Sequence, residues 1–332
     1  MKKIVLFGGE GYIGKVIFQY FEKLNFEIIS FDNLIYFENK KKYISKLKSK
    51  NFIYGDINDT KLVKKIINSA HFAVVLAGLV GDPITKRYPK ESELINNYGT
   101  KNLIDTCLDS NLEKFIFVST CSNYGLNDTD LPLSEEAELK PISLYAKQKV
   151  EVEKYILSQK NNLDCSPTIL RFSTAFGLSP RMRFDLTINQ FTKSIFCNEE
   201  LEVFDSNTWR PYCHVKDFGI AVEKVLEGNK KTTDFQVFNV GGDDNNFTKK
   251  QIVEQIFQFI PDNKVIFTDK KKDPRNYKVN FSKINKILNF KIKYTVHDGI
   301  KEMINFFKKN EKTLNTFNHL KFGNNAIDAE KL

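Results

Sequence analysis

A glycine-rich turn near the N-terminus constrains the fold of this chain more than any other feature. Residues 4–7 are apolar and predict a strand buried on both faces, and an apolar helical period begins at Ile13. Between them, glycines interrupt the apolar run at three-residue spacing: Gly8, Gly11 and Gly14. A strand, a glycine turn and a helix in this order aim free backbone N–H groups at a bound pyrophosphate. For these residues alone, a glycine turn without a ligand stays open as the alternative.

A carboxylate follows the second predicted strand. Residues 26–31 form that strand, which ends at Asp32, about twenty residues beyond the glycines. A carboxylate there binds ribose hydroxyls in dinucleotide-binding folds and repels a 2′-phosphate. Asp32 therefore favours NAD over NADP, and the alternative is an ordinary turn-starting aspartate before Asn33.

Strand and helix patterns alternate through the first half of the chain. Further strands are predicted at residues 52–54, 72–77, 115–118 and 168–172, with helices at 91–110 and 145–158. This alternation predicts an α/β fold, a Rossmann-type doubly wound parallel sheet with right-handed crossovers. Later strands are shorter and mix with helices. We therefore expect an NAD-binding domain, a smaller mixed α/β substrate lobe with segments that return to the first domain, and a loosely held C-terminal tail: residues 1–173, 174–309 and 310–332.

Charge and cysteine usage argue against several other classes of protein. The net charge is +9, but acidic residues are interleaved with the basic ones and no basic stripe with aromatic spacing occurs, so a nucleic-acid surface is disfavoured. Five scattered cysteines lack the spacing of zinc ligands or of a disulfide framework. No apolar run approaches the ~20 residues that cross a membrane. We expect a soluble cytoplasmic protein without a metal, a nucleic-acid partner or a membrane partner.

A tyrosine and a lysine four residues apart open the predicted helix at 145–158. Tyr145 and Lys149 share one helix face, where the ammonium would lower the phenol pKa below its usual value of about 10 and make the phenol a general acid and base. The preceding strand ends through Ser119 and Thr120 at the edge of the sheet that the glycine turn also occupies. Thr120 would hydrogen-bond the substrate oxygen that Tyr145 deprotonates, and Lys149 would also reach a cofactor ribose.

With these motifs the chain resembles the extended short-chain dehydrogenase/reductases, in the branch of nucleotide-sugar epimerases and dehydratases. The resemblance runs from Lys3 to about Lys308. It rests on the three glycines, Asp32, Gly55-Asp56-Ile57, Asn96 in Asn-Asn-Tyr-Gly-Thr, the Ser-Thr-x-x-x-Tyr-Gly run from Ser119, Tyr145 with Lys149, and residues 210–217. It implies that Tyr145 is the catalytic acid and base, with Thr120 and Lys149 as its catalytic partners.

The resemblance also implies NAD as cofactor, a nucleoside-diphosphate sugar as substrate, and a homodimer formed through the helices at 91–110 and 145–158. The expected cofactor contacts are Gly8, Gly11, Tyr12, Ile13, Gly14, Asp32, Asn33, Asp56, Ile57, Leu76, Ala77, Gly78, Asn96, Ser119, Tyr145 and Lys149. The expected substrate contacts are Thr120, Ser122, Thr174, Arg181, Arg183, Arg210 and Arg275. For Arg181, Arg183 and Arg275, a solvated loop or a surface ion pair is an equal alternative.

Departures from the family pattern narrow the expected reaction. The resemblance implies that dehydratases of this branch use an acidic residue or pair, just after the Ser/Thr, to remove a proton from C5. This chain has Cys121 and Ser122 there, so 4,6-dehydration is disfavoured. A packed Cys121 thiol is favoured over an acid/base role. Thr174 and Pro211 replace a frequent Asn and Asp, which indicates a reshaped pocket. The favoured reaction is C4 epimerisation through a transient 4-keto sugar. The alternative is a net C4 dehydrogenase or 4-keto reductase, and a non-catalytic NAD-binding protein ranks lower.

Overall fold

A seven-stranded, entirely parallel sheet forms the centre of the molecule. The computed structural model describes residues 1–47, 51–126, 131–159, 165–261, 264–269, 275–311 and 322–327. The strands of the sheet, in spatial order, are β10 (Gln236–Val240), β6 (Ser166–Phe172), β5 (Lys114–Thr120), β4 (Phe72–Val75), β1 (Lys2–Phe7), β2 (Phe26–Asp32) and β3 (Phe52–Tyr54). Strand order reverses between β1 and β4, and this reversal opens a crevice at the carboxyl ends of the strands.

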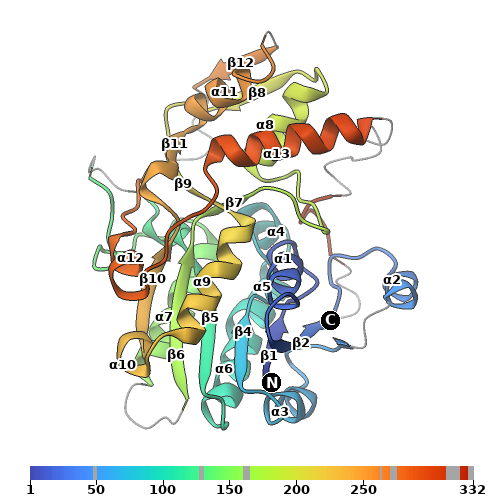
Figure 1. Cartoon of the computed structure of the whole chain (residues 1–332), viewed down its shortest axis with the longest axis vertical. Helices are drawn as coiled ribbons and strands as arrows, with labels where there is room; N and C mark the ends of the chain where they lie inside the picture. Colours follow the sequence, from blue (N-terminus) through green and yellow to red (C-terminus); the bar gives the residue numbers. More distant parts are fainter. Residues whose placement is uncertain are drawn as a thin grey trace.

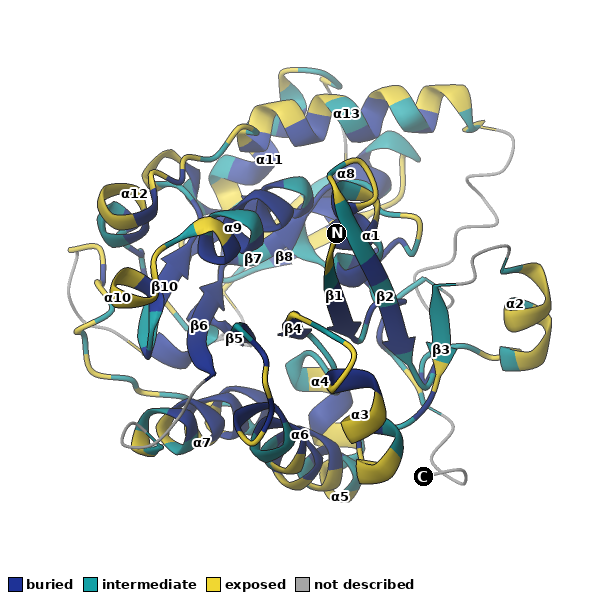
Figure 2. Cartoon of the chain, turned by 60° about the horizontal axis from the view of Figure 1, so that its bottom comes forward, coloured by how far each residue is buried: buried dark blue, intermediate teal, exposed yellow. Residues whose placement is uncertain are grey.

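Helices cover both faces of this sheet, as Figure 2 shows. One face carries α1 (Tyr12–Phe21) and α9 (Val215–Glu227), and the other carries α3 (Thr60–Ile67), α6 (Thr100–Leu108) and α7 (Leu144–Ser158). Successive residues of β1 alternate between the two cores: Ile4 and Leu6 pack with α1 and α9, whereas Val5 and Phe7 pack with α3 and α6. The predicted doubly wound sheet is confirmed, and β1 is buried on both faces.

The predicted helix at 91–110 is built from three shorter elements. These are α5 (Pro89–Ser92), the π-helix η1 (Glu93–Gly99) and α6, and they follow α4 (Asp82–Arg87). The π-helical turn widens the helix next to the cavity described below, which is where such turns are often found. The polar segment after β2 contains a short helix, α2 (Lys40–Lys46).

A smaller lobe lies above the carboxyl ends of the strands (Figure 1). It holds a three-stranded sheet, β11 (Asn246–Thr248), β9 (Trp209–His214) and β7 (Thr174–Phe176), and a two-stranded sheet, β12 (Val265–Thr268) and β8 (Leu201–Phe204). Helices α8 (Thr187–Phe196), α11 (Lys249–Phe257) and α13 (Val296–Lys309) pack together around them. The remaining short elements are η2 (Cys121–Tyr124), α10 (Lys230–Thr233), η3 (Asp243–Asn245) and α12 (Ser282–Leu288). β10 and α9 are the return segments to the central sheet, and the domain boundary at residue 173 stays a prediction.

The C-terminal segment differs from the loose tail that the sequence suggests. Residues 312–321 and 328–332 lie outside the described part of the chain, but residues 322–327 pack against both lobes. The backbone N–H of Phe184 donates to the Phe322 carbonyl at 2.7 Å, and the Asn324 side chain is buried. For residues 322–327 the expectation of a loose tail is therefore wrong.

Two absences hold for the described residues. No helix among them combines the length and hydrophobicity that crossing a bilayer requires. No group of three or more His, Cys, Asp or Glu side chains within the same ranges is arranged to hold a metal ion.

Candidate active site

The glycine turn between β1 and α1 forms one wall of the main cavity. Gly8 has φ +88°, and a Cβ there would lie 2.7 Å from the backbone nitrogen of Ala77. A Cβ on Gly14 would lie 2.3 Å from the carbonyl oxygen of Gly8, so both positions require glycine. Gly11 is the N-cap of α1, no side chain caps the helix, and a Cβ on Gly11 would have the Gly8 oxygen as its one close neighbour, at 3.2 Å. This cradle of bare backbone fits a pyrophosphate.

Asp32 lies at the end of β2 in the same cavity. Its carboxylate accepts hydrogen bonds from the backbone N–H groups of Glu10, at 3.0 Å, and Leu34, at 2.7 Å. Burial raises the pKa of Asp32 to about 6, with a further upward contribution from the Glu10 charge. The carboxylate is therefore ionised at neutral pH, which suits a ribose hydroxyl pair.

Glu10 is a buried acid inside the glycine turn that the sequence reasoning missed. Its carboxylate accepts from Ser30 Oγ at 2.6 Å, from Lys15 Nζ at 2.9 Å, and from the Tyr43 hydroxyl. These contacts tie α2 to the turn beneath Asp32. The one signal in the sequence was an acidic residue between two glycines of the motif.

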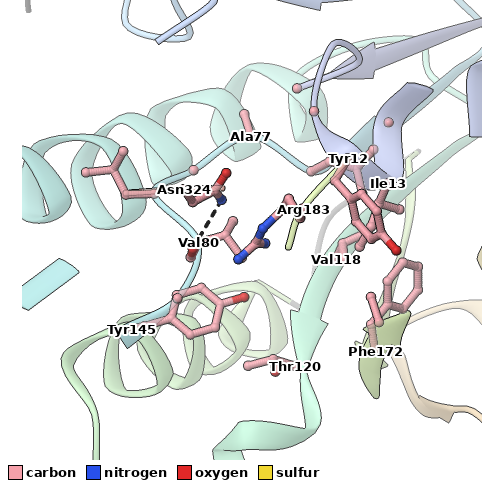
Figure 3. Close-up of a pocket in the computed structure, with 18 of the residues that line it drawn as sticks. Tyr12, Ile13, Ala77, Val80, Val118, Thr120, Tyr145, Phe172, Arg183 and Asn324 are labelled. Atoms are coloured by element: carbon pink, nitrogen blue, oxygen red, sulfur yellow. Dashed lines mark hydrogen bonds between the residues drawn. The ribbon is translucent and has the colours of Figure 1, made fainter. Parts of the chain in front are cut away.

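The predicted catalytic pair meets at the carboxyl end of β5. The Ser143 side chain caps α7 by accepting from Ala146 N at 3.2 Å, which places Tyr145 in the first helical turn. The Tyr145 and Thr120 side chains both line the main cavity, and both are almost fully buried. Figure 3 shows the two side chains facing one cavity. Lys149 Nζ donates to the Val118 carbonyl at 2.8 Å.

The expected lowering of the Tyr145 pKa by Lys149 is wrong for the chain by itself. Burial raises the pKa of Tyr145 above its usual value, and the Asp82 carboxylate acts in the same direction. The Arg183 charge and the Thr120 hydroxyl oppose this rise only in part. Burial also lowers the pKa of Lys149 to about 8. The ammonium of Lys149 is directed at a backbone carbonyl, so desolvation dominates at the phenol.

A buried ion pair joins β6 to α7. Arg171 on β6 binds Glu153 on α7 through two nitrogens, the shorter contact being 2.7 Å. The same carboxylate accepts from Ser119 Oγ and, at 2.8 Å, from the Asn123 amide. Glu153 lies four residues beyond Lys149 and continues its helix face. Neither Glu153 nor Arg171 was predicted from the sequence as a residue of the site.

Almost all of the predicted site residues line one cavity. Those that do are Gly8, Gly11, Tyr12, Ile13, Gly14, Asp32, Asn33, Ile57, Leu76, Ala77, Gly78, Ser119, Thr120, Ser122, Tyr145, Lys149, Thr174, Arg181, Arg183, Arg210 and Arg275. Asp56 and Asn96 instead hold residues that line it. The Asn96 amide accepts from Leu79 N at 2.7 Å and donates to Leu79 O at 2.9 Å, and Asp56 accepts from Asn33 Nδ2 at 2.7 Å. Direct contact of Asp56 or Asn96 with a ligand stays a prediction.

Two arginines from the loop after β7 reach different parts of the cavity. Arg183 forms a double hydrogen bond with Asp185, at 3.0 and 2.6 Å. The Arg181 guanidinium lies over the ring of Tyr36, 4.9 Å from its centroid, and Asp32 is near enough to influence its pKa. Arg181 thus lies at the end of the cavity that Asp32 marks, although the sequence grouped it with the substrate contacts.

The other two arginines come from later segments of the smaller lobe. Arg210 donates to the Arg275 carbonyl, and its guanidinium lies 5.4 Å from the ring centroid of Tyr277. Arg275 forms an ion pair with Asp82 of α4, with 2.9 Å between NH1 and Oδ2. This pair joins the smaller lobe to the central domain beside the cavity.

Two other residues that line the cavity were not predicted from the sequence. Tyr36 donates to the Gly78 carbonyl at 3.4 Å, and its hydroxyl accepts from Val80 N at 3.0 Å. Asn324 comes from the C-terminal segment and donates to the Val80 carbonyl, as Figure 3 shows. Neither residue belongs to a periodic pattern or a known spacing, so no local signal pointed to it.

Cys121 is a buried thiol in the wall of the same cavity. It is 1% exposed and its Sγ contacts the Arg171 carbonyl at 3.2 Å. Burial raises the pKa of the Cys121 thiol to about 12. A neutral, buried thiol is a poor acid or base at neutral pH. The expected packing role of Cys121 stays a prediction.

Fold and site together define a dinucleotide-binding enzyme of the Rossmann type. A family model described as the NAD dependent epimerase/dehydratase family matches residues 4–241, and the chain belongs to this family. NAD is accordingly its cofactor, and the glycine cradle and Asp32 fit that dinucleotide. The predicted family is thereby confirmed.

Similar proteins include both epimerases and dehydratases. The dTDP-D-glucose 4,6-dehydratase of Homo sapiens is 26% identical over 327 residues, which cover 93% of this chain and 91% of that protein. The UDP-glucose 4-epimerase of Halalkalibacterium halodurans is 25% identical over 272 residues, or 76% of this chain and 78% of that protein. A crystal structure of dTDP-glucose 4,6-dehydratase from Bacillus anthracis with NAD has a TM-score of 0.78 at 26% identity, covering 94% of this chain and 98% of that one.

Proposed function

We propose that this enzyme interconverts the C4 epimers of a nucleoside-diphosphate sugar through a transient 4-keto sugar. The observation that carries the proposal is that the Thr120 and Tyr145 side chains line the same cavity as the glycine cradle. Similarity to UDP-glucose and UDP-glucuronate 4-epimerases supports the substrate class.

The chain supplies the acid–base chemistry of this reaction. NAD, when bound, supplies reversible two-electron oxidation at the sugar carbon. Tyr145 takes the proton of the C4 hydroxyl and later returns one to the same oxygen, while Thr120 hydrogen-bonds that oxygen and keeps it beside the phenol. Both side chains are almost fully buried, and exclusion of water by the bound substrate would protect a keto intermediate from side reactions.

Arginines of the smaller lobe fit the diphosphate of the substrate. Arg210 and Arg275 line the cavity on adjoining segments, and Tyr277 packs against the Arg210 guanidinium. Planar, permanently charged guanidinium groups match phosphate oxygens in pairs. We assign Arg210 and Arg275 to the diphosphate, and we assign Arg181, next to Asp32, to the cofactor.

Two alternative reactions use the same fold. A net C4 dehydrogenase or 4-keto reductase would differ only in releasing the oxidised or reduced sugar. A 4,6-dehydratase needs an acid/base group for C5, and Cys121 is a buried neutral thiol while Ser122 is a hydroxyl. The packing of Cys121 therefore weighs against dehydration despite the dehydratases among the similar proteins.

The test is product analysis with UDP, GDP, CDP and dTDP sugars by mass spectrometry and NMR. The proposal expects a C4 epimer of unchanged mass. A product that has lost one water would support dehydration instead, and an oxidised sugar with stoichiometric NADH would support the dehydrogenase. Tyr145→Phe should abolish turnover and leave NAD binding intact.

We also propose that the enzyme forms a homodimer in the cytoplasm. Leu94 and Tyr98 of η1, within the segment 91–110 that is expected to pair, are 44% and 60% exposed. Exposed apolar side chains of this size on one helix favour association. The five unpaired cysteines support a reducing compartment. Light scattering during gel filtration should give twice the chain mass, and Tyr98→Glu should give the single chain; a monomeric wild type would contradict the dimer.

A further inference from the structure

The described C-terminal segment, residues 322–327, completes a wall of the active-site cavity. It is joined to the smaller lobe by the hydrogen bond from Phe184 N to Phe322 O, at 2.7 Å. It is joined to α4 of the central domain by Arg87, which donates to the Asn325 carbonyl at 3.0 Å. Asn324, in this segment, lines the same cavity as Tyr145.

The orientation of the Asn324 amide follows from its two hydrogen bonds. Its backbone N–H donates to Asp185 at 3.4 Å, and its side-chain Nδ2 donates to the Val80 carbonyl at 3.2 Å. Because a carbonyl requires a donor, the nitrogen side of the amide must face Val80, and the oxygen faces away from it. Figure 3 shows this amide beside Val80, with Arg183 and Tyr145 lining the same cavity.

The Asn324 side-chain oxygen lacks a donor. Asn324 is 6% exposed, and its Oδ1 is buried without a hydrogen-bond partner among the residues that the structure describes. Buried polar atoms are nearly always paired, and leaving one unpaired costs free energy. Because a water-sized group does not touch Oδ1 in this conformation, the amide must shift toward the adjoining cavity before a ligand donor satisfies this acceptor.

The chemistry of this oxygen selects the part of the ligand that it contacts. Phosphate oxygens are acceptors and carry negative charge, so they would not pair with Oδ1. The remaining donors of NAD and of a nucleotide sugar are chiefly hydroxyl groups.

We propose that residues 322–327 are a third binding element of the active site, in which Asn324 Oδ1 accepts a hydrogen bond from a ligand hydroxyl, either of the sugar or of an NAD ribose. A hydroxyl of the substrate sugar, here called the sugar arm of the proposal, rests on the proposed function. A hydroxyl of an NAD ribose, the NAD arm, requires only the NAD-binding fold. The segment thus couples both lobes to the bound ligand.

The experiment compares Asn324→Ala with Asn325→Ala. The control removes the same amide one position along, where the side chain does not line the cavity and the backbone carbonyl still accepts from Arg87. Calorimetry measures the Kd for NAD, and steady-state kinetics measure KM and kcat for UDP-glucose and dTDP-glucose. Thermal unfolding checks that both variants are folded.

Asn324→Ala should raise either the KM for the sugar or the Kd for NAD by about 3- to 10-fold, the range expected for one hydrogen bond, while Asn325→Ala changes neither. With the sugar arm, one of the 2-, 3- or 6-deoxy analogues should erase the difference between Asn324→Ala and wild type, which a purely structural role would not do. With the NAD arm, the Kd of one deoxy-ribose analogue of NAD should be the same for Asn324→Ala and wild type.

Unchanged KM and Kd in a folded Asn324→Ala would overturn the proposal. So would an equal loss with every deoxy analogue, because that pattern would mean that Asn324 only anchors the segment. A wild-type enzyme that turns over no nucleotide sugar would instead refute the proposed function, and the NAD arm would still decide the role of Asn324.

Discussion

At the scale of single residues, Tyr145 is a buried phenol within electrostatic reach of the Asp82 carboxylate. Burial and the charge of Asp82 both raise its pKa, so the ionised phenol is disfavoured in the chain by itself. Asp82 also pairs with Arg275, which makes this carboxylate a link between the acid–base group and the arginines assigned to the diphosphate.

Replacing Asp82 should move the pH profile of the reaction. In Asp82→Asn the phenol loses a neighbouring negative charge and Arg275 loses its partner, and both changes lower the pKa of Tyr145. The rising limb of the kcat profile should shift to lower pH by about one unit. Glu113→Gln removes an exposed carboxylate paired with Lys2 and should leave the profile in place. A shift to higher pH in Asp82→Asn would contradict this electrostatic account.

Asp32 should make NAD binding depend on pH. Its pKa is raised to about 6, so the carboxylate accepts ribose hydroxyls above that pH and becomes protonated below it. The Kd for NAD should therefore rise several-fold between about pH 7.5 and about pH 5. Asp32→Asn should bind more weakly at neutral pH, discriminate less against NADP, and lose this pH dependence. An unchanged preference for NAD over NADP would remove Asp32 from the cofactor site.

At the scale of secondary-structure elements, the turn from β1 into α1 depends on glycines for two different reasons. Gly14 has no room for a Cβ because the Gly8 carbonyl is in the way, whereas a Cβ on Gly11 would chiefly enter the cavity. The first requirement concerns the fold, and the second concerns the ligand.

Two alanine substitutions should separate these requirements. Gly11→Ala should keep the free energy of unfolding within about 0.5 kcal/mol of wild type but weaken NAD binding at least about tenfold, because the methyl group blocks the phosphate cradle. Gly14→Ala should lower the free energy of unfolding by about 2 kcal/mol or more through overpacking. Urea unfolding and calorimetry measure the two effects. Equal loss of stability in both variants would show that the cradle is not specific to the ligand.

The link between α7 and β6 depends on the Glu153–Arg171 ion pair. Removing one partner leaves a buried charge, so Glu153→Gln should lower the free energy of unfolding by about 3 kcal/mol. Glu138→Gln alters an exposed ion pair with Lys140 and should cost less than about 0.5 kcal/mol. Urea unfolding compares the two variants. Similar small losses in both would mean that the buried pair adds nothing to stability.

At the scale of the whole molecule, the sequence predicted the regular part of the fold and most of the residues that line one cavity. The parallel sheet followed from buried apolar runs alternating with helical periods, and Gly8, Asp32 and Tyr145 followed from fixed spacings along neighbouring elements. These signals are local, so they can be detected without knowing the tertiary contacts.

Other features depended on contacts between distant segments. Asn324 is held at the cavity by its hydrogen bond to Val80, 244 residues away in sequence. Glu10 joins the glycine turn to α2 through its hydrogen bond from Tyr43. The pKa of Tyr145 was predicted in the wrong direction because burial, which the sequence does not show, outweighs its neighbours. Long-range packing and desolvation thus explain why the sequence did not indicate Asn324, Glu10 or the raised pKa of Tyr145.

The central claim is that the enzyme oxidises and reduces one sugar carbon without net redox change. Its most direct test is incubation of the nucleotide sugar, deuterated at C4, with the wild-type enzyme, followed by NMR and mass spectrometry of the product. The account predicts a C4 epimer that retains deuterium at C4 and has an unchanged mass, with no product from Tyr145→Phe. Loss of the deuterium to solvent, or a product lacking one water, would contradict it.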